Sequence, residues 1–144
     1  MNLSKLDSSD IKSTIEFCWS NDPDIQKFSR NFELDLKGRL EKELDWINKS
    51  STIKFYKIMD NNNFVGYYGN EGKVLTTFFI MPEYRKQKDE VWKYISSQFD
   101  KEFFSGLYKM NTRAINFFLN QGGIKVADSE AENKPVVIFK FEVE

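Results

Sequence analysis

The stretch from Val74 to Met81 constrains the fold of this chain more than any other part of its sequence. It ends in the unbroken apolar run Phe78 to Met81, and Pro82 follows directly. Successive side chains of a strand point to opposite faces of a sheet, so a strand that is apolar at consecutive positions is buried on both faces. Pro82 removes a backbone donor and ends the strand. The sequence therefore predicts a central strand that needs covering layers on both sides.

The first half of the chain shows helical spacing. Residues 3–6 predict a short strand, and Asp7 to Asp10 offer N-cap candidates for a helix near residues 9–19. The break Asp22-Pro23-Asp24 precedes a second helix. Apolar residues recur along that helix every three or four positions: Ile25, Phe28, Phe32, Leu36, Leu40, Leu44 and Ile47.

The period changes after residue 51 to that of strands. We expect a hairpin of residues 53–58 and 64–68, a turn at residues 69–72, and then the central strand. A long helix should follow, with Val91, Trp92, Ile95, Phe99 and Phe103 on one face, and then a short strand at residues 106–110. Asn111 should cap a helix that Gly122-Gly123 closes. Strands at residues 124–126 and 136–143, joined by the polar stretch 128–134, complete one α+β domain over residues 1–144.

Composition excludes several classes of chemistry. The 144 residues contain no histidine, which removes Ser-His-Asp and Cys-His catalysis and His-ligated zinc. The formal net charge is −1, so nothing indicates a nucleic-acid or membrane partner, and no metal site is predicted. Cys18 is the single cysteine and is expected to be a small core residue. The N-terminus has no apolar signal segment, so we expect a protein of the cytoplasm.

The order of elements and two segments resemble the GNAT superfamily, the acyl-CoA-dependent N-acyltransferases. Residues 78–85, FFIMPEYR, resemble the family's central strand running into a "V-x-P-x-Y-R" loop. Residues 111–122, NTRAINFFLNQG, are similar to its "N-x-x-A-I-x-F-Y-x-x-x-G" helix. The resemblance implies an α/β sandwich: a mixed, mostly antiparallel sheet of six or seven strands flanked by about four helices.

The resemblance also implies a place for coenzyme A. The family's pyrophosphate loop reads "R/Q-x-x-G-x-G/A", and here its glycine positions hold Lys88 and Glu90, which obstruct approach of the backbone to a phosphate. The residues that would bind the cofactor are Phe78, Phe79, Ile80, Arg85, Lys86, Gln87, Lys88, Asp89, Glu90 and Asn111.

The catalytic positions implied by the resemblance are also altered. Phe118 stands where the family often has the tyrosine that protonates the departing thiolate. The central strand holds no carboxylate, although Thr76 and Thr77 can hold a water. Possible replacements are Glu71 and Glu83, which flank the strand, and the tyrosines at positions 67, 68, 84 and 108. Each of these, like Trp19, Trp46 and Trp92, also has a plain structural interpretation.

Three hypotheses follow, and the altered loop and the missing tyrosine favour the first, with the second as its alternative. The first is a GNAT fold that binds no cofactor and acts as an assembly or interaction component with a protein partner or as a homo-oligomer. It is similar to the small GNAT-like proteins of tailed-phage structural gene clusters, which would place it in a bacterial or infected cell or in the virion. The second is a divergent acetyl-CoA-dependent N-acetyltransferase in which Arg85, Lys86 and Lys88 take the pyrophosphate. The third is a generic α+β binding module, which a sheet without a splay in its centre would favour.

Overall fold

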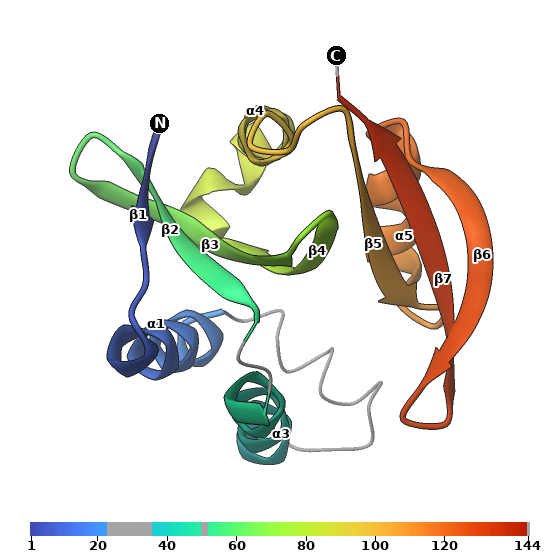
Figure 1. The fold of residues 1–144 in the computed structure, drawn as a ribbon. Coiled ribbons are helices and arrows are strands. Elements are labelled where there is room, and N and C mark those ends of the chain that lie inside the picture. Colours follow the sequence, from blue (N-terminus) through green and yellow to red (C-terminus); the bar gives the residue numbers. More distant parts are fainter. Residues whose placement is uncertain (23–35, 50–51, 144) are drawn as a thin grey trace.

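The computed structural model describes residues 1–22, 36–49 and 52–143, and within them the elements follow the predicted order (Figure 1). The helices are α1 (Ser8–Ser20), α3 (Leu36–Lys49), the 3-10 helix η1 (Pro82–Gln87), α4 (Lys88–Ser96) and α5 (Thr112–Asn120). The strands are β1 (Asn2–Lys5), β2 (Lys54–Asp60), β3 (Asn63–Glu71), β4 (Val74–Ile80), β5 (Glu102–Tyr108), β6 (Ile124–Ala131) and β7 (Lys134–Glu142). The first half of the predicted second helix, residues 25–35, lies outside the described residues.

Among the described residues, the strands form one seven-stranded sheet in the order β1-β2-β3-β4-β5-β7-β6. All neighbouring strands are antiparallel except β4 and β5, which are parallel. The predicted central strand is therefore the middle strand of the sheet, and the α+β class with a mixed, mostly antiparallel sheet is confirmed. No helix in the described ranges is long and apolar enough to cross a membrane.

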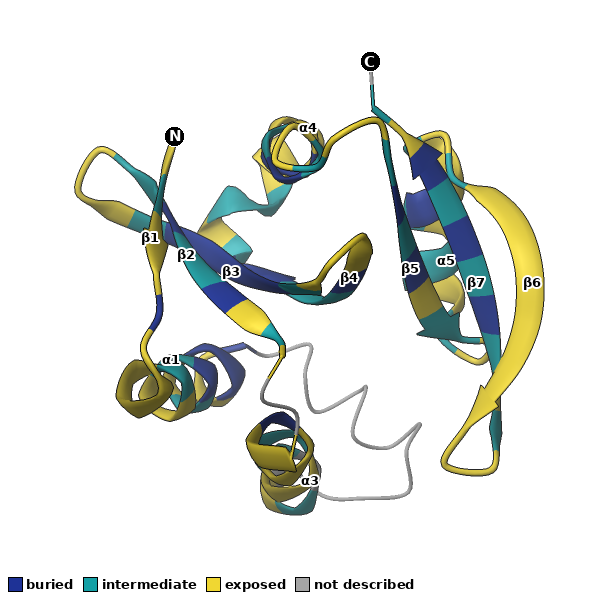
Figure 2. Cartoon of the chain, viewed as in Figure 1, coloured by how far each residue is buried: buried dark blue, intermediate teal, exposed yellow. Residues whose placement is uncertain are grey.

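Two apolar clusters cover the two faces of the sheet. Ile80 of β4 packs into the cluster that contains Trp92 of α4 and Phe118 of α5. Phe79, the preceding residue, packs into the other cluster with Trp19 of α1 and Ile47 of α3. Figure 2 shows the buried residues along the middle of the sheet and on the inner sides of these helices. The consecutive apolar residues of β4 thus fill both layers, as the sequence indicated.

The predicted long helix after Pro82 is wrong in its second half. α4 ends at Ser96, and Phe103 lies in β5, which also begins earlier than the predicted strand at residues 106–110. Phe99 and Phe103 stack on each other with ring centroids 4.4 Å apart, in the same core as Trp92. The chain turns between them at Lys101, which has a φ of 60°. Neither a glycine nor a proline marks this turn in the sequence. Because α4, Phe99 and Phe103 pack into the same core, their apolar residues have the spacing of a single helix although they do not belong to one.

The polar stretch predicted to join the last two strands is itself mostly strand. β6 continues to Ala131, and only Glu132 and Asn133 form the turn to β7. All eight residues of β6 are exposed, as Figure 2 shows, because β6 is the outermost strand of its side of the sheet. A strand exposed on both faces has no apolar alternation to reveal it. The turn predicted at residues 69–72 is likewise shorter, since β3 continues to Glu71.

Gly66 is required by the close approach of β3 to β4. A Cβ atom on this residue would lie 2.0 Å from the carbonyl oxygen of Phe79. We expect Gly66→Ala to lower the free energy of unfolding in urea by about 3 kcal/mol or more, because backbone in the centre of a sheet cannot move aside cheaply. Gly72→Ala is the control: its φ is 56° but the space around it is open, so we expect a loss of about 1 kcal/mol. Equal losses in the two variants would contradict this account.

Candidate active site

The sheet divides between β4 and β5, which share one residue pair in the described chain, Val74 with Phe104. Two hydrogen bonds reinforce this point. The backbone N–H of Phe104 donates to the carbonyl of Lys73 at 2.8 Å, and the hydroxyl of Ser105 donates to the carbonyl of Leu75 at 2.8 Å. Ser105 thus bonds β4 where the strands begin to part, and Figure 1 shows them diverging beyond it. The sheet therefore has a splay in its centre, whereas the third hypothesis would be favoured by a sheet without one.

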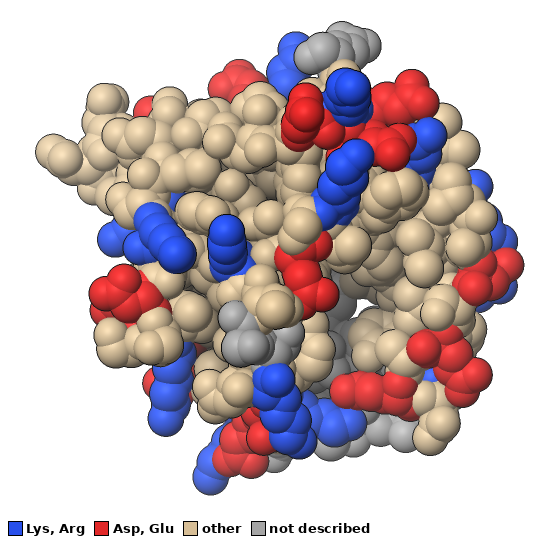
Figure 3. All heavy atoms as spheres, in the orientation of Figure 1, with Lys and Arg blue, Asp and Glu red and all other residues tan. Residues whose placement is uncertain are grey.

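A cleft of about 660 Å³ opens between the parted strands. Its walls come from β4 and β5, from α5, and from α3 and the β6–β7 turn. The lining residues are Trp19, Asp22, Lys42, Glu43, Trp46, Tyr67, Thr76, Thr77, Phe78, Phe79, Ile80, Arg85, Lys88, Ser105, Gly106, Leu107, Tyr108, Asn111, Arg113, Ala114, Phe117, Phe118, Ala131, Glu132 and Val136. Figure 3 shows the molecular surface hollowed beside the β6–β7 hairpin.

Thr76 is the extra residue of a β-bulge in β4. The register passes from Gly69 opposite Thr77 to Asn70 opposite Leu75, so Thr76 has no partner of its own on β3. Its hydroxyl oxygen is buried and makes no hydrogen bond within the described part of the chain. Bulges beside active sites redirect a side chain, and an unsatisfied buried hydroxyl is costly unless a ligand or water completes it. Thr76 therefore lines the cleft with a hydroxyl that is shielded from solvent.

Phe118 forms part of the cleft wall without offering any polar group. It is fully buried, and its ring lies 6.0 Å from that of Phe78 and 5.2 Å from that of Trp92. Asn111, at the start of the same helix, accepts a hydrogen bond from the backbone of Ala114 at 3.3 Å and so caps α5 as predicted. The family's tyrosine position is thus filled by a packing residue that cannot donate a proton.

The segment that would cradle a pyrophosphate is wound into the 3-10 helix η1. The backbone N–H of Tyr84 donates to the carbonyl of Met81 at 2.9 Å, and that of Lys88 donates to the carbonyl of Arg85. These donors are spent within the segment and do not converge on an anion. The carboxylate of Asp89 accepts a hydrogen bond from Gln121 at 2.6 Å and adds negative charge at the start of α4. The backbone donors of Tyr84 and Lys88 are therefore not available to a phosphate, and the Asp89 carboxylate opposes its charge.

Arg85 is held by Asp22 in a two-pronged ion pair. Its Nη1 and Nη2 atoms lie 3.1 and 2.6 Å from the two carboxylate oxygens, and its Nε donates to the carbonyl of Ile80 at 3.2 Å. The Asp22 side chain is 2% exposed and that of Arg85 is 27% exposed. This bidentate arrangement fixes the guanidinium. Arg85 therefore ties the segment after β4 to the end of α1.

The residues predicted to bind the cofactor fall into two groups. Those that line the cleft are Phe78, Phe79, Ile80, Arg85, Lys88 and Asn111. Those outside its lining are Lys86, Gln87, Asp89 and Glu90. Lys88 reaches the cleft with its Nζ 5.6 Å from the centroid of the Phe117 ring, and Arg113 lies one turn before Phe117 on the same face of α5. Two basic side chains therefore flank this part of the cleft.

Among the predicted catalytic replacements, Tyr108 and Tyr67 line the cleft, and Tyr108 is the one whose hydroxyl donates to a carboxylate there. It donates from the end of β5 to Glu132 at 3.2 Å. Tyr67 also lines the cleft, but its hydroxyl accepts a hydrogen bond from Trp19 Nε1 at 3.0 Å and its burial raises its pKa. Tyr68, Tyr84, Glu71 and Glu83 lie outside the lining.

Sequence reasoning missed the carboxylates that line the cleft: Asp22 after α1, Glu43 on α3 and Glu132 in the β6–β7 turn. It favoured a core position for Trp46, with a protein contact as the alternative, and this side chain is 42% exposed and lines the cleft one turn after Lys42. The helical spacing of Lys42, Glu43 and Trp46 puts them on one side of α3, but only the tertiary structure shows that this side meets β5 and the hairpin.

Cys18 behaves as the core residue that the sequence predicted. It is fully buried in the cluster between α1 and the sheet. Burial, with a smaller contribution from Asp22, raises the pKa of its thiol from 9.0 to about 12. The thiol is therefore protonated at neutral pH and is not an activated nucleophile.

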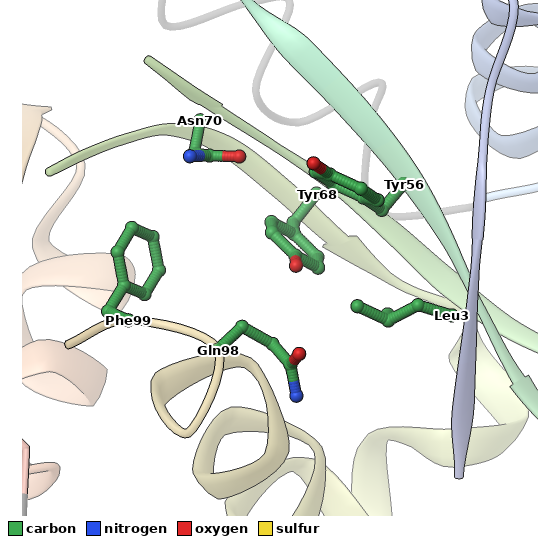
Figure 4. A pocket seen from close by; sticks show the side chains of 6 residues that line it. All are labelled: Leu3, Tyr56, Tyr68, Asn70, Gln98 and Phe99. Carbon is green, nitrogen blue, oxygen red and sulfur yellow. The ribbon is translucent and has the colours of Figure 1, made fainter. Parts of the chain in front are cut away.

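A second, smaller pocket of about 160 Å³ lies between strands β1–β3 and the segment after α4 (Figure 4). Tyr56 and Tyr68 stack there with ring centroids 5.2 Å apart, and Leu3, Asn70, Gln98 and Phe99 complete the lining. It contains no charged side chain, and burial raises the pKa of Tyr68. Of these two pockets, the larger cleft is thus the one lined by charged side chains.

Comparison with protein families decides the relationship. A family model described as an acetyltransferase (GNAT) domain matches residues 21–121. The chain belongs to the GNAT acetyltransferase family. This membership and the splay together overturn the third hypothesis, in which the likeness was accidental. A search of curated protein sequences finds no match.

Solved structures agree with the family fold. An acetyltransferase from Thermus thermophilus superposes with a TM-score of 0.70 at 13% identity, covering 99% of this chain and 97% of that one. A GNAT acetyltransferase from Bacillus cereus ATCC 10987 gives 0.59 at 17% identity, with 98% and 96% covered. The spermidine N-acetyltransferase SpeG of Vibrio cholerae, as its N152L mutant, gives 0.58 at 14% identity, with 98% and 92% covered. At these identities the likeness concerns the fold.

Loss of the Asp22 carboxylate should destabilise this GNAT domain without changing the lining of the cleft elsewhere. We expect Asp22→Asn to lower the free energy of unfolding in urea by about 2–3 kcal/mol, because the Arg85 guanidinium keeps a largely buried position without its counter-charge. Asp10→Asn, an exposed carboxylate in the first turn of α1, is the matched control and should cost less than about 1 kcal/mol. A loss in Asp22→Asn no larger than the control's would mean that the ion pair contributes little.

Proposed function

We propose that this GNAT protein is an acyl-CoA-dependent N-acyltransferase whose donor lies between β4 and β5. The observation that carries this proposal is the open cleft of about 660 Å³. Beyond Val74 and Phe104 the facing edges of the two strands line this cleft and do not pair with each other in the described chain. An extended, amide-containing ligand can complete such edges with hydrogen bonds. The unsatisfied hydroxyl of Thr76 supports a polar ligand at the same place.

Side chains would hold the phosphates of the donor in place of the backbone loop. Lys88 and Arg113 line the cleft near Phe117 and supply positive charge. Phe78 and Ile80 offer the strand edge and apolar contacts to the pantetheine arm. An acyl-CoA bound here supplies an acyl group activated as a thioester. SpeG, which has a similar fold, is named a spermidine N-acetyltransferase, so an amine is the acceptor that we propose here.

Tyr108 is the residue that we assign to protonation of the departing thiolate. Phe118 cannot perform this role, and the hydroxyl of Tyr108 lies in the cleft wall with Glu132 as its acceptor. We expect Tyr108→Phe to lower kcat about a hundredfold while the affinity for acetyl-CoA stays unchanged. Tyr84→Phe, outside the cleft, is the control and should retain kcat. Equal kcat in both variants would remove Tyr108 from the reaction.

A second candidate function is favoured by the segment after β4. The backbone donors of Tyr84 and Lys88 are used inside η1 and Arg85 is bound to Asp22, so these groups do not serve a phosphate. This supports a GNAT fold kept as a non-catalytic assembly or interaction component with a protein partner or a second copy. The virion role within this candidate stays a prediction from the sequence. The two candidates differ in one measurable property, the binding of acetyl-CoA.

Calorimetric titration of acetyl-CoA into the purified protein distinguishes the two candidates. The acyltransferase should bind with a dissociation constant in the micromolar range. Lys88→Glu should weaken binding about tenfold or more, since it reverses a charge in the cleft. Lys86→Glu makes the same change at an exposed position outside the lining and should have little effect. No heat and no thermal shift at millimolar acetyl-CoA would reject the acyltransferase and leave the non-catalytic candidate.

A further inference from the structure

The turn between β6 and β7 places a glutamate in an unfavourable backbone conformation. Glu132 and Asn133 have φ angles of 52° and 62°, which are characteristic of a two-residue type I′ turn. Asparagine, aspartate and glycine suit both central positions of such a turn, whereas glutamate has no short side chain to offset the left-handed conformation. Asn133 fits this preference and Glu132 does not. A strained residue that persists beside a cleft points to a role for its side chain.

The carboxylate of Glu132 lies where the two halves of the molecule meet across the cleft. Its Oε2 accepts the hydrogen bond from Tyr108, at the end of β5, at 3.2 Å. The same oxygen lies 3.5 Å from Nζ of Lys42 on α3. All three side chains line the cleft. Figure 3 shows acidic atoms gathered over the β6–β7 hairpin beside the hollow. Glu132 is thus both at the surface, with a 43% exposed side chain, and in contact with the assigned proton donor.

The surroundings of Glu132 suit an organic cation. Lys42, which contacts Glu132, is followed on α3 by Glu43 and, one turn later, by Trp46, which is 42% exposed, and all of them line the same cleft. An aromatic face and carboxylates together attract an alkylammonium group, the first by cation–π attraction and the second by charge. Lys42 is itself a primary alkylammonium, and its approach to Glu132 from within the cleft shows how such a group reaches the carboxylate.

We propose that Glu132 is the acceptor-binding carboxylate of this enzyme and that it selects alkylammonium acceptors, with the ammonium of Lys42 taking their place when none is bound. This proposal rests on the acyltransferase function proposed above. It explains why a glutamate, which is long enough to reach Tyr108, occupies a turn position that favours asparagine.

Two substitutions at Glu132 separate its charge from its backbone strain. Both Glu132→Gln and Glu132→Asn remove the charge, so each should weaken an alkylamine such as propylamine about tenfold, measured by calorimetry on protein saturated with coenzyme A and as KM. For aniline, which is uncharged at neutral pH, KM should stay unchanged. Only asparagine suits the left-handed turn, so Glu132→Asn should melt about 2 °C or more above Glu132→Gln.

Glu130→Gln is the matched control, since it removes the same charge two residues earlier on β6, outside the cleft lining. It should leave amine affinity and the preference for propylamine over aniline unchanged. If both Glu132 variants keep the wild-type affinity for propylamine while acetyl-CoA still binds, the proposal is overturned. If acetyl-CoA itself does not bind, the acyltransferase function fails first, which the donor titration shows independently.

Discussion

The parting of β4 from β5 is the constraint on which the rest of this structure depends. The residue pair Val74 with Phe104 holds the two strands together at one end, together with the hydrogen bond from the hydroxyl of Ser105 to the carbonyl of Leu75. If β4 and β5 stayed hydrogen-bonded side by side beyond this point, the sheet would be continuous and no cleft would form. Because they diverge, residues of both strands, of α5 and of α3 face one space. The apolar cluster that contains Trp92 spans both parts of the sheet, with Leu75 of β4 and Phe103 of β5, whereas the cluster that contains Trp19 covers the part up to β4.

Much of the fold could be predicted because local chemistry and tertiary structure agree there. The apolar run of β4, ended by Pro82, indicates the middle strand, and Asn111 caps α5 through its own side chain. The predicted boundaries are wrong where the apolar pattern along the chain does not reflect the secondary structure. Phe103 belongs to the same core as α4 but sits in β5, and β6 is exposed throughout and so lacks the alternation that marks a strand. Neither boundary is visible in the spacing of residues along the chain.

The candidate site was only half accessible to sequence reasoning for a similar reason. Phe78, Ile80 and Lys88 follow each other along the chain, and a family motif can be laid on them. Glu43, Trp46 and Glu132 come from a helix face and a turn that are far apart in sequence, and they join the site only because α3 and the β6–β7 hairpin face the same cleft. Glu132 alone carried a signal in the sequence, a long carboxylate at a turn position that short side chains prefer.

The single junction between β4 and β5 also determines how this protein can adjust to ligands of different size. Two strands that diverge from one point enclose a wedge, so a small rotation about that point changes the width most at the open end and least at Ser105. The ion pair of Arg85 with Asp22, which fastens the segment after β4 to α1, resists such a rotation on one side. The width of the wedge is therefore set by residues that fix the angle between the strands as much as by those that line it.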